Sequence, residues 1–546
     1  MVKSLSVTLE DSSPSETEAP RRKRGISPLQ AAMVLAATIF LSRIIGLVQL
    51  RIINATLSPE ARDAYFAAFR LPDAVNYLIA GGAMSVTFIP IFVSLKERDS
   101  REAWRFFSTV ASLMSVVLVA LLTLCFLLAN PLVRVMNPGF DARKLDIAVQ
   151  MTRVLLPAQL FFYLGGMMVG VLNAHRRFGA SGMTSAVYNT VAIAVGLALW
   201  LMLGDIGFAW GITVGALCGS FLLPLVAALQ GPREQRLQFQ PSFDWRLPSV
   251  QTFFRNALPI MLGVSLPVVD QQIVGIFASY LPDGHLSYLQ NGNRAMLAPL
   301  GILAQAASVA AFPFMAGDSA NKDWPALADF MRSGLRRLMF LALPISMLLI
   351  LNATPIIKIL FGSQSFLLEN KGTALPLTAL AFAWYCAGLF AWAGQQFVAR
   401  GFYALQDTVT PTIIGSVLTI FFFIPLCWMA ARWGGVAGLA IATSVGACAH
   451  FCGVLLALEA KLKRRPYKVD LGVARIWGTL LRTGAATLIM AAFGVVAMRI
   501  SHSWSTLPQM LFITVPACMA FGFAARAFRI PEWNWVAGKI RAKLKR

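Results

Sequence analysis

The sequence contains little charge, and acidic residues are especially scarce. Only 13% of its 546 residues are charged, with 25 Asp and Glu against 47 Lys and Arg, for a formal net charge of +22. A soluble protein would carry about 25% charged residues, so a water-exposed globular fold is excluded. Hydrophobic residues make up 57% of the chain and gather in runs of about 20 residues. We therefore predict an all-α integral membrane protein.

The groups on which enzymes and metal sites depend are also sparse. The four histidines, at positions 175, 285, 450 and 502, are scattered, and no acid–base pair or metal-ligand spacing stands out. The seven cysteines all lie inside apolar runs, which argues against a disulfide framework. No G-x-x-x-x-G-K-[ST] loop occurs, so ATP hydrolysis by this chain is not expected. We predict no enzymatic activity, no metal site and no cofactor.

The apolar runs predict about fourteen transmembrane helices. Two of these spans, near 63–94 and 286–316, are long and contain prolines, so we expect them to bend. The predicted spans lie near 31–54, 63–94, 104–128, 147–173, 181–203, 207–229, 256–281, 286–316, 330–352, 374–403, 410–431, 435–459, 474–499 and 506–528.

The basic residues predict the orientation of these spans. With the N-terminus inside, the cytoplasmic segments hold about 32 Lys and Arg and the outer loops about 8. Both termini are therefore expected to be cytoplasmic, with the basic clusters facing anionic phospholipids. Nucleic-acid binding is not expected, because no soluble domain is large enough to present a basic surface.

An internal repeat predicts two related bundles. A shift of 223 positions places Tyr65 on Tyr288, Ser85 on Ser308 and Pro90 on Pro313, and three further pairs in this window are also identical. Such parallel repeats predict two pseudosymmetric six-helix bundles with a cleft between them, as in transporters. The predicted divisions are a disordered cytoplasmic tail (1–28), an N-terminal lobe (29–230), a cytoplasmic linker (231–255), a C-terminal lobe (256–460), two additional helices (474–528) and a basic cytoplasmic tail (529–546).

Several arginines lie inside predicted spans, where an unpaired charge is costly. Arg43 is at the middle of the first span, where insertion scales assign it a cost of about 3 kcal/mol. Arg51, Arg70 and Arg294 are the other candidates for a functional role, whereas Arg153, Arg400 and Arg482 can reach the headgroups. Acidic residues at comparable depth are fewer, namely Asp63, Asp73 and Asp270.

This excess of buried arginine predicts a cationic cleft. A positive cleft with low-dielectric walls attracts anions, and the planar guanidinium suits phosphate oxygens through two parallel hydrogen bonds. We therefore expect an anionic substrate with a phosphate or pyrophosphate group.

Asp270 is a separate candidate, for a coupling cation. Without an ATP-binding loop, the energy must come from an ion gradient, the membrane potential or the gradient of the substrate itself. Asp270, followed by two glutamines in the seventh span, could hold a monovalent cation, or it could make a polar contact between helices.

Five segments of the sequence resemble a known family. "SRIIGLVQLRI", "DAYFAAFRLPDAV" and "GGAMSVTFIPIF" are similar to the opening of the MviN/MurJ lipid II flippases, and "GVLNAHRRFG" and "ARGFYALQDTVTPT" to later segments. The similarity covers 31–430 in the correct order. It implies the fold of the multidrug/oligosaccharidyl-lipid/polysaccharide exporters, with a hydrophobic groove for a polyprenyl tail on the two additional helices. The implied location is the bacterial cytoplasmic (inner) membrane, and the implied function is to carry lipid II outward for cell-wall synthesis.

The resemblance also assigns site residues. By position, Ser42 and Arg43 match the Ser-Arg pair of the family's first helix, Arg294 its arginine on the eighth, Asp63 its acid at the outer gate, and Ser85 a serine of the second. The chain departs from the family at Gln49-Leu50, at Asn76-Tyr77, where a basic pair is common, and at Gly81, where glutamate is usual. The expected headgroup-binding residues are Ser42, Arg43, Arg51, Arg70, Asn76, Ser85 and Arg294.

Three other functions are compatible with parts of this pattern. A related flippase for another polyprenyl-pyrophosphate-linked oligosaccharide would carry the same pyrophosphate and would need the same cationic cleft. A cationic-drug exporter would need cavity carboxylates to outnumber arginines, which is the reverse of this sequence. A scaffold for other cell-wall synthesis proteins could use the basic tail and the linker, but it has no reason to keep Arg43 at mid-membrane.

Overall fold

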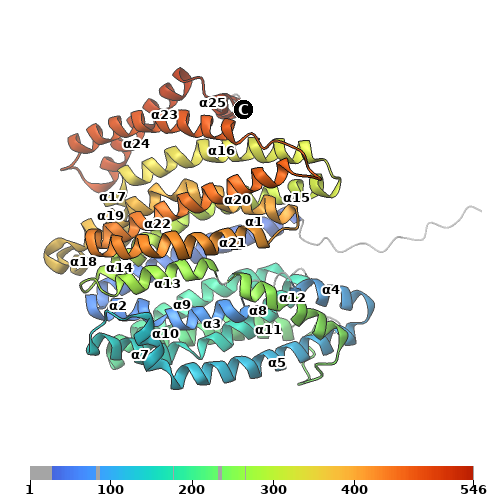
Figure 1. Ribbon diagram of the computed structural model, residues 1–546. Helices are drawn as coiled ribbons and strands as arrows, with labels where there is room; N and C mark the ends of the chain where they lie inside the picture. The colour runs from blue at the N-terminus through green and yellow to red at the C-terminus, as the bar shows by residue number, and fades with distance from the viewer. Residues whose placement is uncertain (1–27, 81–86, 176, 231–235, 265, 545–546) are drawn as a thin grey trace, which may run out of the picture.

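The computed structural model describes residues 28–80, 87–175, 177–230, 236–264 and 266–544. Within these ranges the chain is helical, without a β-strand. Two groups of roughly parallel helices lie side by side (Figure 1). This arrangement confirms the predicted all-helical membrane fold with two bundles. Of the predicted N-terminal tail, only Pro28 lies inside the described residues.

The first group, here called the N lobe, extends from α1 to α11. Breaks divide it into short and long helices, some at polar residues such as Asp99 and others at apolar residues such as Phe69 and Leu128. They are α1 (Pro28–Thr56), α2 (Pro59–Ala68), α3 (Arg70–Ala80), α4 (Ile89–Arg98), α5 (Ser100–Leu127), α6 (Ala129–Met136), α7 (Ala142–Leu155), α8 (Ala158–Ala174), α9 (Phe178–Leu203), the 3₁₀ turn η2 (Gly204–Ile206), α10 (Gly207–Gly215), the π-helix η3 (Ala216–Leu222) and α11 (Leu223–Leu229).

The second group, here called the C lobe, extends from α12 to α22, and three further helices follow it. The C lobe consists of α12 (Pro248–Val264), α13 (Leu266–Ala278), α14 (His285–Leu300), η5 (Gly301–Gln305), α15 (Ala306–Ala320), α16 (Trp324–Leu351), α17 (Ala353–Phe361), α18 (Gln364–Leu368), η6 (Glu369–Gly372), α19 (Ala374–Ala387), α20 (Leu389–Ala404), α21 (Val409–Leu418), η7 (Thr419–Phe423) and α22 (Ile424–Lys463). The last three helices are α23 (Val473–Ile500), α24 (Thr506–Ala527) and α25 (Pro531–Leu544).

Among the described residues, seven helices are long and apolar enough to cross a membrane, and the pair α19–α20, bent by 40°, makes an eighth. Two of the seven are 51 and 55 residues long, or about 75 Å and 80 Å, far more than the roughly 30 Å of a bilayer core. Each of these two reverses direction, at η2 and at Gly435, and so contains two passes. The other passes are divided by breaks: α2 to α4, α12–α13, and α14–α15. Both long proline-containing spans, which were expected to bend, are thus divided into shorter elements.

The repeat found in the sequence extends through the third pass of each lobe. Shifting α5 by 223 positions gives 323–350, and α16 occupies Trp324–Leu351. The same shift carries α6 to 352–359, and α17 occupies Ala353–Phe361. The two lobes therefore share the order of their long and short helices as well as a few residues.

Glycines allow the two reversing passes to pack closely. Gly207, Gly211, Gly215 and Gly219 recur every four residues and so line one face of the returning helix. A Cβ at Gly211 would lie 2.5 Å from the carbonyl oxygen of Ala192, and one at Gly219 would lie 2.2 Å from the backbone nitrogen of Tyr188. In the C lobe, Gly438 faces Ala430 in the same way. Backbone contacts of this kind replace the hydrophobic effect as a packing force within lipid.

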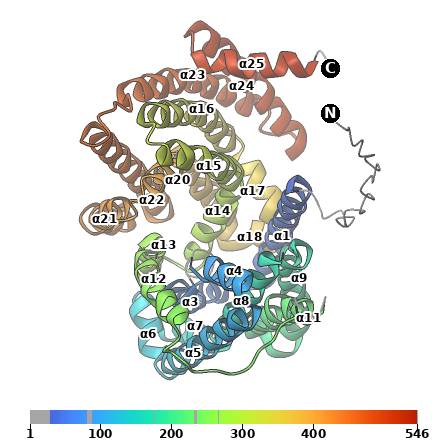
Figure 2. The same ribbon diagram turned by 90° about the vertical axis from the view of Figure 1, so that its right-hand side faces the viewer.

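Two long segments join the lobes. Figure 2 looks along the bundle and shows α1 on one side and α12–α13 on the other. Helix α1 packs against α9 of the N lobe and reaches α17 and α18 of the C lobe. Conversely, α12 packs on α3 and α5, where Phe253 lies 6.2 Å from Phe106, while α13 packs on α22. The linker segment 236–247 lies along α5, and the helix already begins at Pro248, inside the predicted linker.

The last helices pack on the C lobe away from the N lobe. Helices α23 and α24 pack together, and both contact α16. Residues 531–544 were expected only to be part of a basic tail, and they form helix α25. An ion pair of 2.8 Å between Glu532 and Arg336 joins α25 to α16. Large apolar side chains on the outer face of α24 are exposed, namely Leu507, Leu511, Val515, Met519 and Phe523.

Candidate functional site

Helix α14 of the C lobe carries an unusual number of polar residues for a membrane pass, and they face the N lobe at three levels. The ends of the bundle are here called the Ser58 end, where α1 turns into α2, and the Asp99 end, where α4 turns into α5. Helix α14 starts at the Ser58 end with Gly284, whose φ of 88° is left-handed and suits glycine. Side-chain hydrogen bonds and ion pairs join the lobes from Arg43 to the Ser58 end.

At the first level, Asp63 of α2 binds the start of α14. Its carboxylate oxygens accept hydrogen bonds from the backbone amides of Gly284 at 2.8 Å and Ser287 at 2.7 Å. The first amides of a helix have no intrahelical partner and carry a partial positive charge, so a carboxylate is well placed there. Asp63, expected from the resemblance to be the acid at the outer gate, thus binds the backbone amides at the start of α14.

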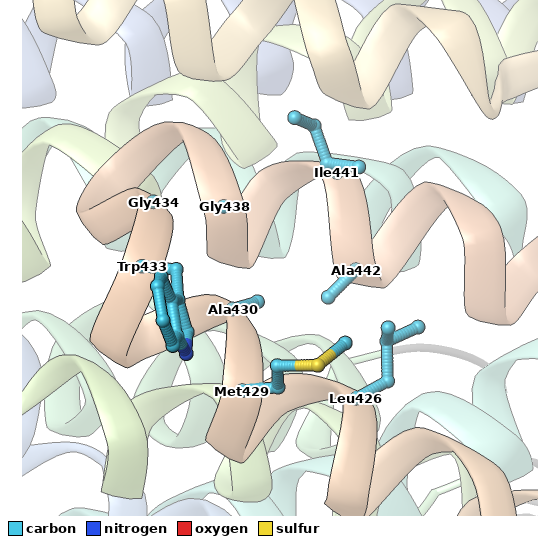
Figure 3. Close-up of a pocket in the computed structure, with 8 residues that line it drawn as sticks. All are labelled: Leu426, Met429, Ala430, Trp433, Gly434, Gly438, Ile441 and Ala442. Atoms are coloured by element: carbon cyan, nitrogen blue, oxygen red, sulfur yellow. The ribbon is translucent and has the colours of Figure 1, made fainter.

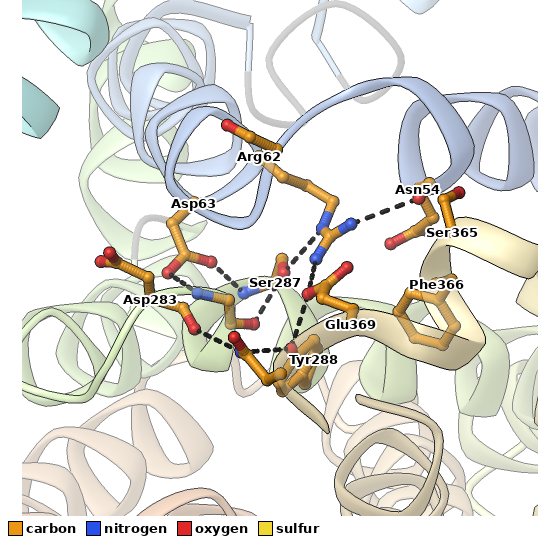
Figure 4. Close-up of polar contacts among 12 residues, drawn as sticks. Asn54, Arg62, Asp63, Asp283, Ser287, Tyr288, Ser365, Phe366 and Glu369 are labelled. Carbon is orange, nitrogen blue, oxygen red and sulfur yellow. Dashed lines mark hydrogen bonds and ion pairs between the residues drawn. The ribbon is translucent and has the colours of Figure 1, made fainter. Parts of the chain in front are cut away.

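Arg62 lies beside Asp63 and forms a buried ion pair between the lobes (Figure 4). The side chain of Arg62 is 0% exposed and that of its partner, Glu369 in η6, is 9% exposed. Arg62 also donates to the hydroxyl of Ser287 at 3.0 Å and to the carbonyl of Asn54 at 3.3 Å. The hydroxyl of Tyr288 donates to Glu369 at 2.6 Å. Every charge in this group is therefore compensated.

Lys144 of α7 completes the contacts at this level. Its ammonium group lies 3.8 Å from Asp63 and also pairs with Asp283, in the turn before α14. We call the set Arg62, Asp63, Lys144, Asp283, Ser287, Tyr288 and Glu369 the lock, because it fastens α2 and α7 of the N lobe to the C lobe. Of this set, only Asp63 was predicted from the sequence, because Arg62 and Glu369 lie just outside predicted spans. The adjacent opposite charges Arg62 and Asp63 at a span end were the available signal.

Just past the lock, Arg70 joins three segments. It donates to the side-chain oxygen of Gln272 at 2.9 Å, to Asn137 at 2.7 Å and to the carbonyls of Met136 and Gln272. Gly275 leaves room for it, since a Cβ there would lie 2.7 Å from the guanidinium carbon. In this conformation the guanidinium of Arg70 is occupied by protein groups, so Arg70 holds α3 against α13.

At the second level a cavity of about 100 Å³ lies between the lobes. Arg294 enters it from α14 and Asp73 from α3. Arg294 stacks over the ring of Phe66 at 5.2 Å, and among the described residues no carboxylate oxygen lies within 4.0 Å of it. The lining residues are Phe66, Phe69, Arg70, Asp73, Gln271, Gln272, Gln290, Asn293, Arg294 and Leu297.

Arg43 marks the third level. From the middle of α1 it donates to the carbonyls of Leu297 at 3.1 Å and Ala298 at 3.4 Å. Leu297 also lines the cavity and follows Arg294 by three residues, so Arg43 contacts the same short stretch of α14 that carries Arg294. Gly301 makes this approach possible, because a Cβ there would lie 2.4 Å from an Arg43 nitrogen.

The remaining predicted site residues lie away from this cavity. Arg51 donates to the carbonyl of Ile359 near the end of α17 at 2.5 Å, a favourable position for a cation at a helix C-terminus. Ser42 accepts from Asn189 of α9 at 3.1 Å, Asn76 donates to Gln159 of α8 at 2.8 Å, and Asp270 accepts from Thr419 at 2.8 Å. Ser85 and Gly81 lie outside the described residues.

A second, larger pocket of about 370 Å³ lies at the turn of α22 (Figure 3). Its walls are apolar residues and glycines, and Trp433 on its rim is 87% exposed. No charged group in its lining could neutralise a phosphate, so we do not regard it as the site for an anionic headgroup.

Comparison with known proteins agrees with this geometry. A profile of the family described as "Lipid II flippase MurJ" matches residues 58–516. The chain belongs to the MurJ family of lipid II flippases. The resemblance seen in the sequence motifs is thereby confirmed, as is the prediction of a transporter rather than an enzyme.

Related proteins match this MurJ-family chain over nearly its whole length. Lipid II flippase MurJ of Burkholderia cenocepacia is 28% identical over 538 residues, which cover 95% of this chain and 99% of the relative. A probable lipid II flippase MurJ of Synechocystis is 24% identical, with coverage of 96% and 99%. These relatives span both lobes and the helices that follow them.

Solved structures show the same fold. "Lipid II flippase MurJ, inward closed conformation" superposes with a TM-score of 0.73 at 21% identity, covering 91% of this chain and 99% of that one. An inward-facing multidrug resistance MATE family transporter superposes with a TM-score of 0.65 at 14% identity, covering 80% and 99%. The two-lobed architecture is thus shared with exporters of unlike cargo, and the cargo must be argued from the site.

Proposed function

We propose that this MurJ-family chain moves lipid II, the undecaprenyl-pyrophosphate-linked sugar-pentapeptide, from the inner to the outer leaflet of the bacterial cytoplasmic membrane. The observation that carries the proposal is the contact of Arg43 with the stretch of α14 that bears Arg294, beside a polar cavity between the lobes. A cation held at this depth is matched by an anionic ligand.

The two arginines suit a pyrophosphate in different ways. Arg294 has no carboxylate partner within 4.0 Å among the described residues, so its donors can bind phosphate oxygens directly. Arg43 is bound to two neutral carbonyls, which an anionic oxygen can replace with a gain in electrostatic energy. Binding would draw α1 and α14 together and so couple the two lobes.

The orientation follows from the basic residues. The Asp99 end carries most of the Lys and Arg residues of the loops, so this end and both termini would be cytoplasmic. The lock lies at the opposite end and would therefore close the outer side. Asp63 is then the gate residue of a state that is closed to the outside. Rocking of the lobes would break the lock and present the headgroup to the outer leaflet.

The polyprenyl tail needs an apolar path alongside the lobes. The exposed stripe of α24, from Leu507 to Phe523, together with α23, provides such a surface for the chain and for phospholipids. For coupling, Asp270 and Thr419 form a candidate site for a monovalent cation between α13 and η7. Other cell-wall synthesis proteins are candidate partners at the cytoplasmic face.

The test is lipid II flipping in proteoliposomes. Arg43→Ala and Arg294→Ala should each abolish flipping while the protein still inserts and folds. The matched control is Arg101→Ala, an exposed arginine at the start of α5, which should flip at the wild-type rate. Normal flipping by both cavity variants would refute the proposal. Complementation of a strain depleted of its lipid II flippase then separates lipid II from another polyprenyl-pyrophosphate-linked oligosaccharide.

A further inference from the structure

The pocket at the turn of α22 is a gap between the two arms of one helical hairpin. Near the turn the arms touch, because a Cβ at Gly438 would lie 2.3 Å from the carbonyl oxygen of Ala430. Further from the turn they touch again, because a Cβ at Gly446 would lie 2.7 Å from the ring of Phe423. Between these two contacts the arms leave about 370 Å³ open (Figure 3).

The corresponding hairpin of the N lobe has backbone contact at the same level. A shift of 231 positions places Gly204 on Gly435, and both have a left-handed φ, of 64° and 52°. The same shift places Gly211 on Ala442. A Cβ at Gly211 would lie 2.5 Å from the carbonyl oxygen of Ala192, whereas Ala442 lines the gap. The gap is therefore a property of the hairpin in the C lobe, and the shared fold does not require it.

The gap lies in the half of the membrane next to the Ser58 end. The arm that starts at Gly435 finishes near Lys461, which pairs with Asp407 after the pass that begins at the lock, so the turn is at the Ser58 end. From Gly434 to Ala442 the gap extends about 12 Å along the helix. This length is most of one leaflet of a bilayer core that is about 30 Å thick.

The walls of the gap select a hydrocarbon chain. A water molecule would need two to four polar partners, and the lining consists of apolar side chains and glycines. An empty gap would deprive these side chains of dispersion contacts, and the acyl chains of the adjacent leaflet lie at the same depth. The gap has about twelve times the volume of a water molecule in the liquid. A methylene group is of similar size, so most of one acyl chain fits.

A cation at the same turn lies where the head of such a lipid would be. Arg432 is exposed, and its guanidinium carbon lies 4.1 Å from the ring centroid of Trp428. No carboxylate oxygen in the described part of the chain lies within 4.0 Å of Arg432. Trp433, on the rim, is 87% exposed, and tryptophan is enriched at the level of the lipid headgroups. The guanidinium can therefore bind phosphate oxygens through parallel hydrogen bonds.

We infer that the α22 hairpin binds one anionic phospholipid, with an acyl chain in the gap and the phosphate on Arg432. The phosphate lies outside the apolar pocket, so the pocket itself needs no charge. An anionic lipid fits best, because it carries no ammonium group that would compete with Arg432 for the phosphate. The inference goes beyond the proposed function, since this lipid is not the cargo. In the proposed orientation it belongs to the outer leaflet.

The test is photolabelling of the full chain in nanodiscs. The discs contain phosphatidylcholine and a small fraction of phosphatidylglycerol with a photoactivatable acyl chain, and the labelled peptides are mapped by mass spectrometry. Wild type should be labelled within residues 426–442. Ala442→Leu, which fills the gap, and Arg432→Gln, which removes the cation, should each reduce this labelling at least fivefold. Arg134→Gln, at an exposed arginine of α6 at the same end, is the matched control and should leave it unchanged.

Two results would overturn the inference. Unchanged labelling of the hairpin in Arg432→Gln, a surface change that leaves the fold intact, would mean that the lipid only surrounds the helices. Loss of the label on adding undecaprenyl phosphate in tenfold excess would mean that the gap takes a polyprenyl tail instead. The melting temperature provides a second measurement. Added phosphatidylglycerol should raise it for wild type in detergent and not for Ala442→Leu, and an equal rise in both would also overturn the inference.

Discussion

Arg62 and Glu369 lie 307 residues apart in the sequence and form a buried ion pair that joins the two lobes. The guanidinium stacks against the rings of Tyr288 and Phe366, with its carbon 5.9 and 5.6 Å from their centroids. A charge buried in this way is stable only while its partner stays in place. The ion pair between Arg62 and Glu369 therefore opposes separation of the two lobes at the Ser58 end.

Replacing one partner of this pair should open the lock. In Glu369→Gln the buried Arg62 loses its counter-charge, which destabilises the closed state by about 3 kcal/mol. The measurement uses a cysteine introduced in the cavity by Gln290→Cys, in a chain that also carries Cys518→Ser. The rate at which a membrane-impermeant thiol reagent labels this cysteine should rise. Glu459→Gln, which removes one of the two carboxylate partners of the half-exposed Lys463, is the control and should label at the original rate. Unchanged labelling in Glu369→Gln would show that the pair does not hold the closure.

Asp63→Asn should weaken the same closure by a smaller amount. Asparagine keeps the shape and one acceptor, but it loses the charge at the N-terminus of α14 and the attraction to Lys144. A carboxylate at a helix N-terminus contributes about 0.3–1 kcal/mol when exposed and about 2 kcal/mol when partly buried. The same thiol assay should therefore place Asp63→Asn between wild type and Glu369→Gln. A labelling rate above that of Glu369→Gln would contradict this ranking.

Gly301→Ala should impair transport without touching a charged residue. The added methyl group would lie 2.4 Å from an Arg43 nitrogen and so must displace the guanidinium from α14. Flipping in proteoliposomes should fall at least tenfold while expression and monodispersity remain normal. Gly317→Ala is the matched control, because nothing lies within 4 Å of its added carbon. Full activity in Gly301→Ala would mean that the contact of Arg43 with α14 is dispensable.

Asp407, in the turn after α20, should make stability depend on acid pH. Partial burial alone would raise its pKa, but hydrogen bonds from Lys461 and Thr410 outweigh that effect and lower the pKa from 3.8 to about 2. The stabilisation is therefore complete above about pH 4 and is lost as the pH falls towards 2. The melting temperature measured in detergent should fall more steeply over this pH range for wild type than for Asp407→Asn. The same dependence of melting temperature on pH in both proteins would exclude a contribution of Asp407 to acid stability.

Much of the fold could be predicted from local features of the sequence. Long apolar runs predict membrane helices wherever their packing partners lie. The two long proline-containing spans, expected to bend, are irregular: one breaks at Phe69, and the other contains the π-helix η5 just after Pro299. The repeat relation was visible in identical residues and extends to α5 and α16. These features depend on composition and spacing within a segment, so tertiary contacts do not alter them.

The candidate site was only partly predictable. The depth of Arg43 in its span singled it out, and it contacts the carbonyl of Leu297, a residue that lines the cavity. Arg51 has the same sequence signature, yet it binds a backbone carbonyl of α17, and Arg70 is fully engaged between α3 and α13. Glu369 gave no signal, since an acidic residue in a polar loop is ordinary until the loop folds over a buried arginine.

The sequence by itself determined that this chain is a helical membrane protein with two related halves and more buried cation than anion. Only the tertiary structure decided which of those cations are neutralised by protein groups and which remain to bind a ligand. The physical reason is that the cost of burying a charge depends on the residue and its depth, which the sequence shows. The compensation depends on groups hundreds of residues away, which meet only when the two lobes close against each other.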